Sequence, residues 1–138
     1  MRGIENAVER IQAHLIRYTR IIEAAIHRMD KLADRIQSRA DKMEEGGADV
    51  SEAEGFLAEA HAELDAASAD LLLIQIEAEA DVVLNASSTP ATVFENVHTL
   101  VKSVREHLRG AHQALKNAVQ SLRTQVSADV EVGTDAGE

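Results

Sequence analysis

Apolar residues recur along the first segment of the chain with the seven-residue period of packed helices. In residues 3–45 every heptad a position is apolar, and the d positions are apolar until Arg39. Some neighbouring e positions, such as Ile26 and Ala33, widen this stripe, which suits a helix facing two partners. The repeat predicts a long helix in coiled-coil-like packing. The a series is Met1, Val8, Leu15, Ile22, Met29, Ile36 and Met43, and the d series is Ile4, Ile11, Tyr18, Ala25, Leu32 and Arg39.

A second helical pattern covers residues 51–84. Gly46 and Gly47 end the first helix, and Ser51 to Glu54 form a capping-box sequence with Ser51 as the expected N-cap. Residues 71–76 are apolar almost all round, so we expect them to be the best-buried part of the domain. The a positions are Leu57, Leu64, Leu71 and Ala78, and the d positions are Ala53, Ala60, Ala67 and Ile74.

The third pattern covers residues 90–126 and begins at Pro90, which suits a first helical turn. After residue 126 the period is lost, and residues 127–138 indicate a disordered acidic tail. The predicted fold is all-α: an antiparallel, up-down-up, coiled-coil-like three-helix bundle over residues 1–126, with long helices at about 3–45, 51–84 and 90–126. The apolar series of the third helix is Phe94, Val101, Leu108, Leu115 and Leu122.

Composition adds limits on function and location. Of 138 residues, 45% are hydrophobic but only 2% are aromatic, so Ala, Leu, Ile and Val must build the core. The formal net charge of −10 argues against nucleic acid as a partner. No apolar run approaches the roughly 20 residues of a membrane span, and no signal-peptide core is visible. We expect an extracytoplasmic protein if a signal peptide was removed, and a cytoplasmic one otherwise.

The middle segment is strongly acidic. No Lys or Arg occurs between residues 46 and 89, so all fourteen lie in the flanking segments. One interpretation is a solvated face whose carboxylates pair with arginines across a groove, at about 0–1 kcal/mol each. The other is a docking face for a basic partner or for divalent cations. The carboxylates that we assign to a candidate partner surface are Glu59, Glu63, Asp70, Glu77 and Asp81.

Motifs that carry chemistry are weak. Glu95 and His98 have the Glu-x-x-His spacing of di-iron bundles, but only one such motif is present. The histidines border the predicted seams, apart from His27, and raise the hypothesis of pH sensitivity. The sequence shows no catalytic motif, and an Ala-rich core leaves little room for a substrate pocket. We therefore expect no enzyme activity, no cofactor and no dedicated metal site.

A resemblance adds to this interpretation. The runs that carry it are Arg35-Ile36-Gln37-Ser38-Arg39, the hairpin from Gly46 to Ala60, the Thr89-Pro90 turn and the helix from Ala111 to Leu122. Over about residues 5–124 the chain resembles uncharacterised helical proteins predicted from genomes of candidate-phyla (Patescibacteria-type) bacteria. Members of that group usually begin with a signal peptide or membrane anchor. The resemblance implies an extracytoplasmic helical protein and transfers no site residues.

Three functional interpretations follow. The first is a non-enzymatic binding or structural module at the cell envelope that presents a helix surface to a protein partner, or to a second copy of itself. The second is an amphipathic protein that binds lipid or a membrane surface, against which the acidic middle helix counts. The third is a metal-dependent enzyme in a helical bundle.

Overall fold

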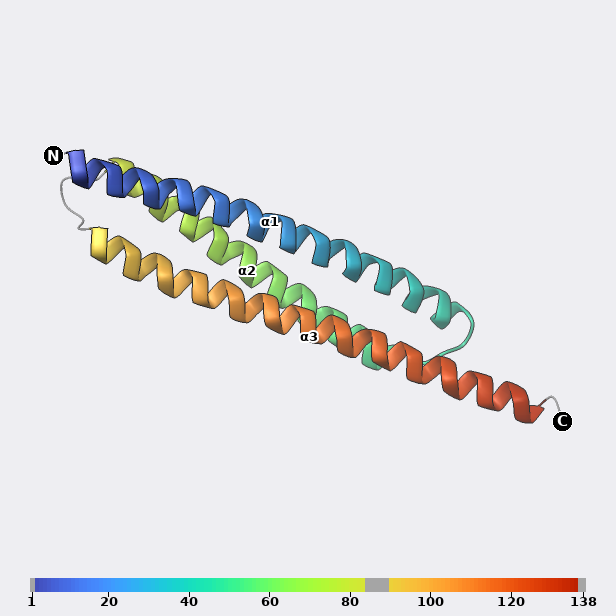
Figure 1. The fold of residues 1–138 in the computed structure, drawn as a ribbon. Coiled ribbons are helices and arrows are strands. Elements are labelled where there is room, and N and C mark those ends of the chain that lie inside the picture. The colour runs from blue at the N-terminus through green and yellow to red at the C-terminus, as the bar shows by residue number, and fades with distance from the viewer. Residues whose placement is uncertain (1, 84–89, 137–138) are drawn as a thin grey trace. The chain divides into compact units, whose positions relative to one another are not determined.

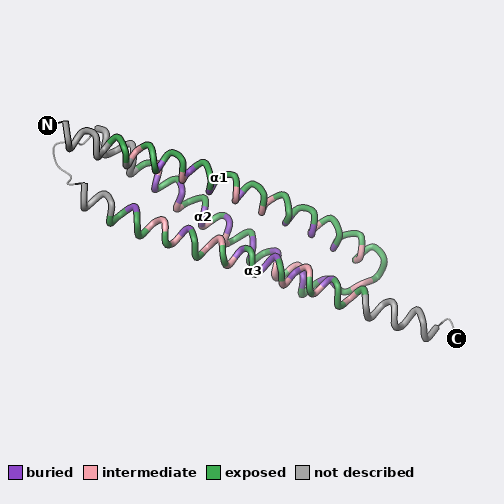
Figure 2. The backbone as a smooth tube through the Cα atoms, in the orientation of Figure 1, coloured by how far each residue is buried: buried purple, intermediate pink, exposed green. Residues whose placement is uncertain are grey.

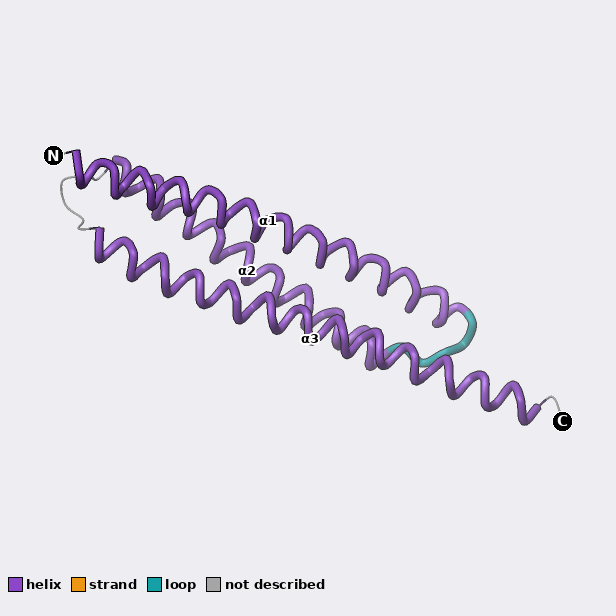
Figure 3. Tube along the Cα trace, in the orientation of Figure 1, coloured by secondary structure: helices purple, strands orange, loops and turns teal. Residues whose placement is uncertain are grey.

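The protein is an all-α, three-helix bundle. The computed structural model describes the backbone of residues 2–83 and 90–136, and the side chains of residues 9, 10, 12–76 and 95–126. Within these residues the elements are α1 (Arg2–Glu45), α2 (Ser51–Val83) and α3 (Pro90–Ala136), and no strand occurs (Figures 1 and 3). The predicted all-α class and the three helices are confirmed. Their antiparallel, coiled-coil-like arrangement stays a prediction.

Glycine ends α1 as expected. Gly47 has a positive φ of 96°, a conformation that costs little only for a residue without Cβ. Its N–H donates to the Glu44 carbonyl at 2.9 Å, and the Ala48 N–H donates to the Met43 carbonyl at 2.9 Å. This pair of hydrogen bonds is the Schellman motif, which satisfies carbonyls that the end of a helix leaves unpaired.

The helix α2 begins at Ser51 as predicted, but the group that caps it differs from the prediction. Asp49, not Ser51, supplies the capping oxygen: its Oδ1 accepts from the Ser51 hydroxyl at 2.7 Å and from the Ser51 N–H at 3.1 Å. The Glu54 N–H donates to the Val50 carbonyl rather than to a Ser51 side chain. The predicted capping box is therefore wrong, because the Ser51 N–H bonds to Asp49 and the Glu54 N–H bonds to the Val50 carbonyl. Both hydrogen bonds lower the pKa of Asp49, and the one from the Ser51 hydroxyl has the larger effect.

The third helix also extends further than predicted. We placed its end near residue 126 and a disordered tail at 127–138, whereas α3 continues to Ala136. Without apolar periodicity a helix loses the stabilisation that comes from packing against its neighbours. The helical backbone nevertheless continues until a residue that ends helices. No Pro follows Pro90, and the first Gly after Gly110 is Gly133, so a strong stop signal is absent before that point.

The packing divides the chain into two compact units, and each contains parts of all three helices. Unit 1 comprises Met1–His27 and Asp65–Leu108, and unit 2 comprises Arg28–Leu64 and Arg109–Glu138. The division therefore falls inside every helix rather than in a loop. Figure 2 shows buried positions recurring at intervals along each helix.

Unit 2 has a core built largely from alanine. Leu57, Leu64 and Leu115 are the largest of its fully buried side chains. Alanine lets helix backbones approach closely, so a few leucines are enough to fill the remaining space. One cluster of buried residues in unit 2 consists of Ala33, Ile36, Ala40, Val50, Ala53, Leu57, Ala60, Ala114, Leu115, Ala118 and Leu122.

Unit 1 corrects the expectation for residues 71–76. Leu71 and Ile74 are buried, but Leu72, Leu73 and Ile76 are 56%, 49% and 51% exposed. These three hydrophobic side chains of α2 are therefore only about half covered by the described part of the chain. An apolar run all round a helix indicated burial on every side, but two neighbouring helices cover only part of its circumference.

The register of α1 is shifted from the predicted seam. Among the described residues, the buried line runs through the a positions Leu15, Ile22 and Ile36 and the e positions Thr19, Ile26, Ala33 and Ala40. The Thr19 hydroxyl donates to the Ile16 carbonyl at 2.9 Å. In contrast, the d residue Leu32 is 41% exposed. The prediction that the d series forms the core is therefore wrong for Leu32, because a helix that faces two partners turns its a/e side toward the centre.

Candidate functional sites

Three d positions of α1 lie outside its buried line and face pockets that α1 and α3 form together. Leu32 and Arg39 line two pockets in unit 2, and Tyr18 lines one in unit 1. On α3 a single seven-residue series lines all three pockets, and its members are His98, Arg105, His112, Val119 and Val126. Because exposed residues such as Arg105 and His112 line these pockets, they do not test the prediction that the Ala-rich core leaves little room for a substrate pocket.

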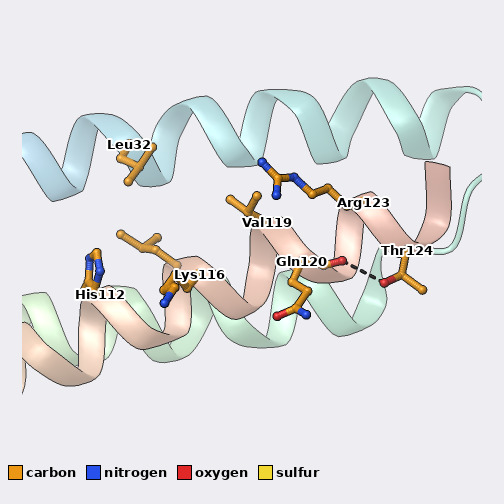
Figure 4. A pocket seen from close by; sticks show the side chains of 8 residues that line it. Leu32, His112, Lys116, Val119, Gln120, Arg123 and Thr124 are labelled. Carbon is orange, nitrogen blue, oxygen red and sulfur yellow. Dashed lines mark hydrogen bonds between the residues drawn. The ribbon is translucent and has the colours of Figure 1, made fainter. Parts of the chain in front are cut away.

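The larger pocket of unit 2 has a volume of about 630 Å³. Figure 4 shows Leu32 reaching from α1 toward residues of α3, with the Arg123 guanidinium directed toward α1. The Thr124 hydroxyl donates to the Gln120 carbonyl of the same helix at 3.0 Å, which holds the Thr124 side chain against α3. The lining residues are Leu32, His112, Leu115, Lys116, Val119, Gln120, Arg123 and Thr124.

A second pocket of unit 2, of about 460 Å³, shares Val119 and Arg123 with the first. Its other lining residues are Ile36, Arg39, Leu122 and Val126. We call the two together the α1–α3 groove of unit 2. The groove combines apolar side chains with three fixed cations, Arg39, Lys116 and Arg123, and none of its lining residues is acidic. In a chain of net charge −10, this is a local reversal of charge.

The predicted acidic partner surface is only partly exposed. Glu59 faces solvent. Glu63 lies against α3, because a Cβ added at Gly110 would be 3.1 Å from its Cδ. Glu77 and Asp81 lie outside the residues whose side chains are described.

Asp70, the remaining predicted surface residue, faces α3 as well. Its Oδ2 accepts from the Ser103 hydroxyl at 2.5 Å and lies 3.6 Å from His107 Nε2. Ser, His and Asp are thus brought together, but the order is wrong for an activated nucleophile. Such a site requires the imidazole between the hydroxyl and the carboxylate, whereas here the carboxylate lies between the other two. We interpret this cluster as a polar contact between α2 and α3.

An acidic cluster that the sequence did not single out lies beside the α1–α2 turn. The carboxylate oxygens of Asp41, Glu44 and Glu54 lie within 4.8 Å of one another. Oxygen ligands suit calcium or magnesium. The Schellman turn and the Asp49 cap bring these residues together, which heptad reasoning along single helices does not foresee. Exposed acidic groups also cluster without metal, so this arrangement alone assigns no function.

The histidines are distributed over different environments. His14 and His98 line the unit 1 pocket, His112 lines the unit 2 groove, and His27 and His61 are exposed. Glu95, the other residue of the Glu-x-x-His spacing, is also exposed. Both residues of the candidate metal motif are therefore exposed, and His98 also lines the pocket.

Within the described residues, no helix contains a segment long and apolar enough to cross a membrane. In comparisons with known proteins, no family model, no curated protein and no solved structure matches this chain.

Proposed function

We propose that the protein is a non-enzymatic binding module whose α1–α3 groove in unit 2 receives an acidic amphipathic helix of a protein partner. The observation that carries this proposal is the combination of an apolar lining with cations from both helices. An envelope location is part of the proposal and depends on the resemblance to extracytoplasmic helical proteins.

The chemistry of the groove favours a helix as the occupant. An amphipathic helix binds a hydrophobic groove through apolar anchors spaced three or four residues apart. Leu32, Val119 and Val126 provide apolar contacts for such anchors. Acidic residues flanking the anchors would meet Lys116 and Arg123, which improves orientation and association rate more than affinity.

The acidic surface of α2 is a weaker candidate for the same role. Of its described members, Glu63 and Asp70 lie against α3, and only Glu59 is fully directed to solvent. A partner that needs a row of free carboxylates would therefore find few. The groove offers its charges and its apolar surface together.

The test is a binding titration with a fluorescent acidic helical peptide of Leu/Glu heptads, followed by anisotropy at low salt. The double variant Lys116→Glu/Arg123→Glu is expected to weaken binding by about tenfold or more, a loss of about 1.4 kcal/mol. The matched control is Lys31→Glu/Arg35→Glu, because both residues are exposed, lie in unit 2 and change the net charge equally. A Leu/Lys peptide should not bind.

Two results would overturn the proposal. If both double variants weaken the peptide equally, the effect is net charge and the groove is not the site. If light scattering shows a stable dimer that Lys116→Glu/Arg123→Glu dissociates, a second copy of the chain occupies the groove instead of a partner.

A further inference from the structure

Unit 1 has a pocket of its own between α1 and α3, with a volume of about 470 Å³. This volume lies in the range of small-molecule sites, which run from about 300 to 1,000 Å³. It shares no residue with the groove of unit 2. The lining residues are Arg10, His14, Leu15, Tyr18, Val97, His98, Val101 and Arg105.

The Tyr18 hydroxyl is the most informative group in this pocket. Its oxygen is buried, and no acceptor for its proton is found among the described residues. Burial raises the pKa of Tyr18, and the positive charge of Arg105 and a hydrogen bond with that side chain oppose the shift without reversing it. A buried hydroxyl without an acceptor destabilises the free protein, and a bound ligand that accepts its hydrogen bond would remove that cost.

The charges around this hydroxyl indicate the sign of the ligand. Arg10 lines the pocket from α1 and Arg105 from α3, so positively charged residues lie on both sides. Planar guanidinium groups bind carboxylate and phosphate through paired hydrogen bonds. None of the lining residues is acidic. The polar part of a ligand bound here is therefore an anion.

The remaining lining residues indicate an apolar body. Leu15 and Val97 are buried, and Val101 is half-buried beside them. Of the three, Val101 keeps the most exposed apolar surface, which an inorganic anion would leave against water and an alkyl chain would cover. An apolar surface with a few convergent polar groups is the usual composition of a ligand site.

We propose that the unit 1 pocket binds a single-chain anionic amphiphile, with its carboxylate or phosphate held between Arg10 and Arg105 and accepting a hydrogen bond from Tyr18. Such an anion has two sources: a free amphiphile in solution, or the headgroup region of an anionic bilayer. The site requires no part of the unit 2 groove, so either proposal can fail while the other stands.

The first arm of the test uses dodecanoate below its micellar concentration, measured by isothermal titration calorimetry. Dodecanoate is expected to bind one per chain, and dodecyltrimethylammonium, with the same chain and the opposite charge, is not. Arg10→Gln/Arg105→Gln should weaken dodecanoate binding by about tenfold or more. Arg17→Gln/Arg20→Gln is the control, because both residues are exposed on the same helix and outside the pocket.

Tyr18→Phe provides a readout that separates binding from folding. It should weaken dodecanoate binding severalfold while raising the thermal midpoint of the free protein, because the buried hydroxyl without an acceptor is gone. If Tyr18→Phe binds dodecanoate as tightly as the parent protein does, the assigned role of the hydroxyl is wrong. If both arginine double variants bind alike, or if the cationic chain binds equally well, the whole proposal is overturned.

The second arm distinguishes the two sources with phosphatidylglycerol and phosphatidylcholine vesicles at low salt. Dodecanoate binding without vesicle binding would identify a site for free amphiphiles. Co-sedimentation with phosphatidylglycerol alone, abolished by Arg10→Gln/Arg105→Gln, would identify the bilayer as the source. Absence of binding in both arms would refute the site.

Discussion

Two glycines in helical segments give a direct test of how closely Glu63 approaches α3. Gly55 in α2 and Gly110 in α3 both have negative φ, so alanine is allowed by the backbone at each position. An added Cβ at Gly55 meets nothing within 4 Å. At Gly110 it lies 3.1 Å from Glu63 Cδ and Oε2 and 3.3 Å from Glu63 Cγ.

The magnitudes follow from helix propensity and from this contact. Gly→Ala in an exposed helix interior stabilises by about 0.8–1 kcal/mol, so Gly55→Ala should gain most of that. At Gly110 the Glu63 side chain must move by a few tenths of an ångström, and Glu63 is already engaged in an interaction of its own. We expect the gain there to be cancelled to within about 0.5 kcal/mol.

The assay is urea unfolding followed by circular dichroism, with a thermal scan as a second measurement. Gly55→Ala should raise the midpoint by roughly 2–5 °C and Gly110→Ala by much less. In a Glu63→Ala background, Gly110→Ala should recover about 0.5–1 kcal/mol, and the difference between backgrounds is the coupling energy. Equal gains for Gly55→Ala and Gly110→Ala in the parent protein would refute the close approach of Glu63.

Three further predictions follow from the same structure. Gly47→Ala should cost about 1–2 kcal/mol in urea unfolding, because its φ of 96° is unfavourable for a residue with Cβ. Leu57→Ala should cost about 2–5 kcal/mol, whereas Leu72→Ala, at an exposed position, should stay within about 0.5 kcal/mol. Because the pKa of Asp49 is lowered from 3.8, its carboxylate stabilises the fold above that pH, and this contribution is lost as pH falls below it. The difference in thermal midpoint between the parent protein and Asp49→Ala should therefore be present at neutral pH and close in acid.

Local signals in the sequence predicted the elements well. The end of α1 at Glu45 and the starts of α2 at Ser51 and α3 at Pro90 match the expected positions, because glycine, the Asp-Val-Ser run and proline act within one or two turns. The end of α3 was missed because no such signal stands at residue 126. A loss of apolar period is evidence about packing and not about the backbone.

The candidate sites were harder to predict because they depend on which face of each helix meets which neighbour. A heptad pattern does not say whether d or e accompanies a in the core when a helix has two partners, and here Ala33 is buried while Leu32 is half-exposed. The same uncertainty placed Glu63 and Asp70 on a free surface, although both lie against α3.

One signal in the sequence did mark the pockets, although apolar periodicity hides it. On α3 the series His98, Arg105 and His112 repeats every seven residues, as an apolar seam would, and then continues as Val119 and Val126. Burying a cation without a counter-charge is costly, and Arg105 stays exposed at the unit 1 pocket. The unit 1 pocket and the unit 2 groove are both lined by apolar side chains and by cations. Both proposals rest on this shared composition, because an occupant of either site must bring negative charge and apolar surface together, as an acidic amphipathic helix and an anionic amphiphile both do.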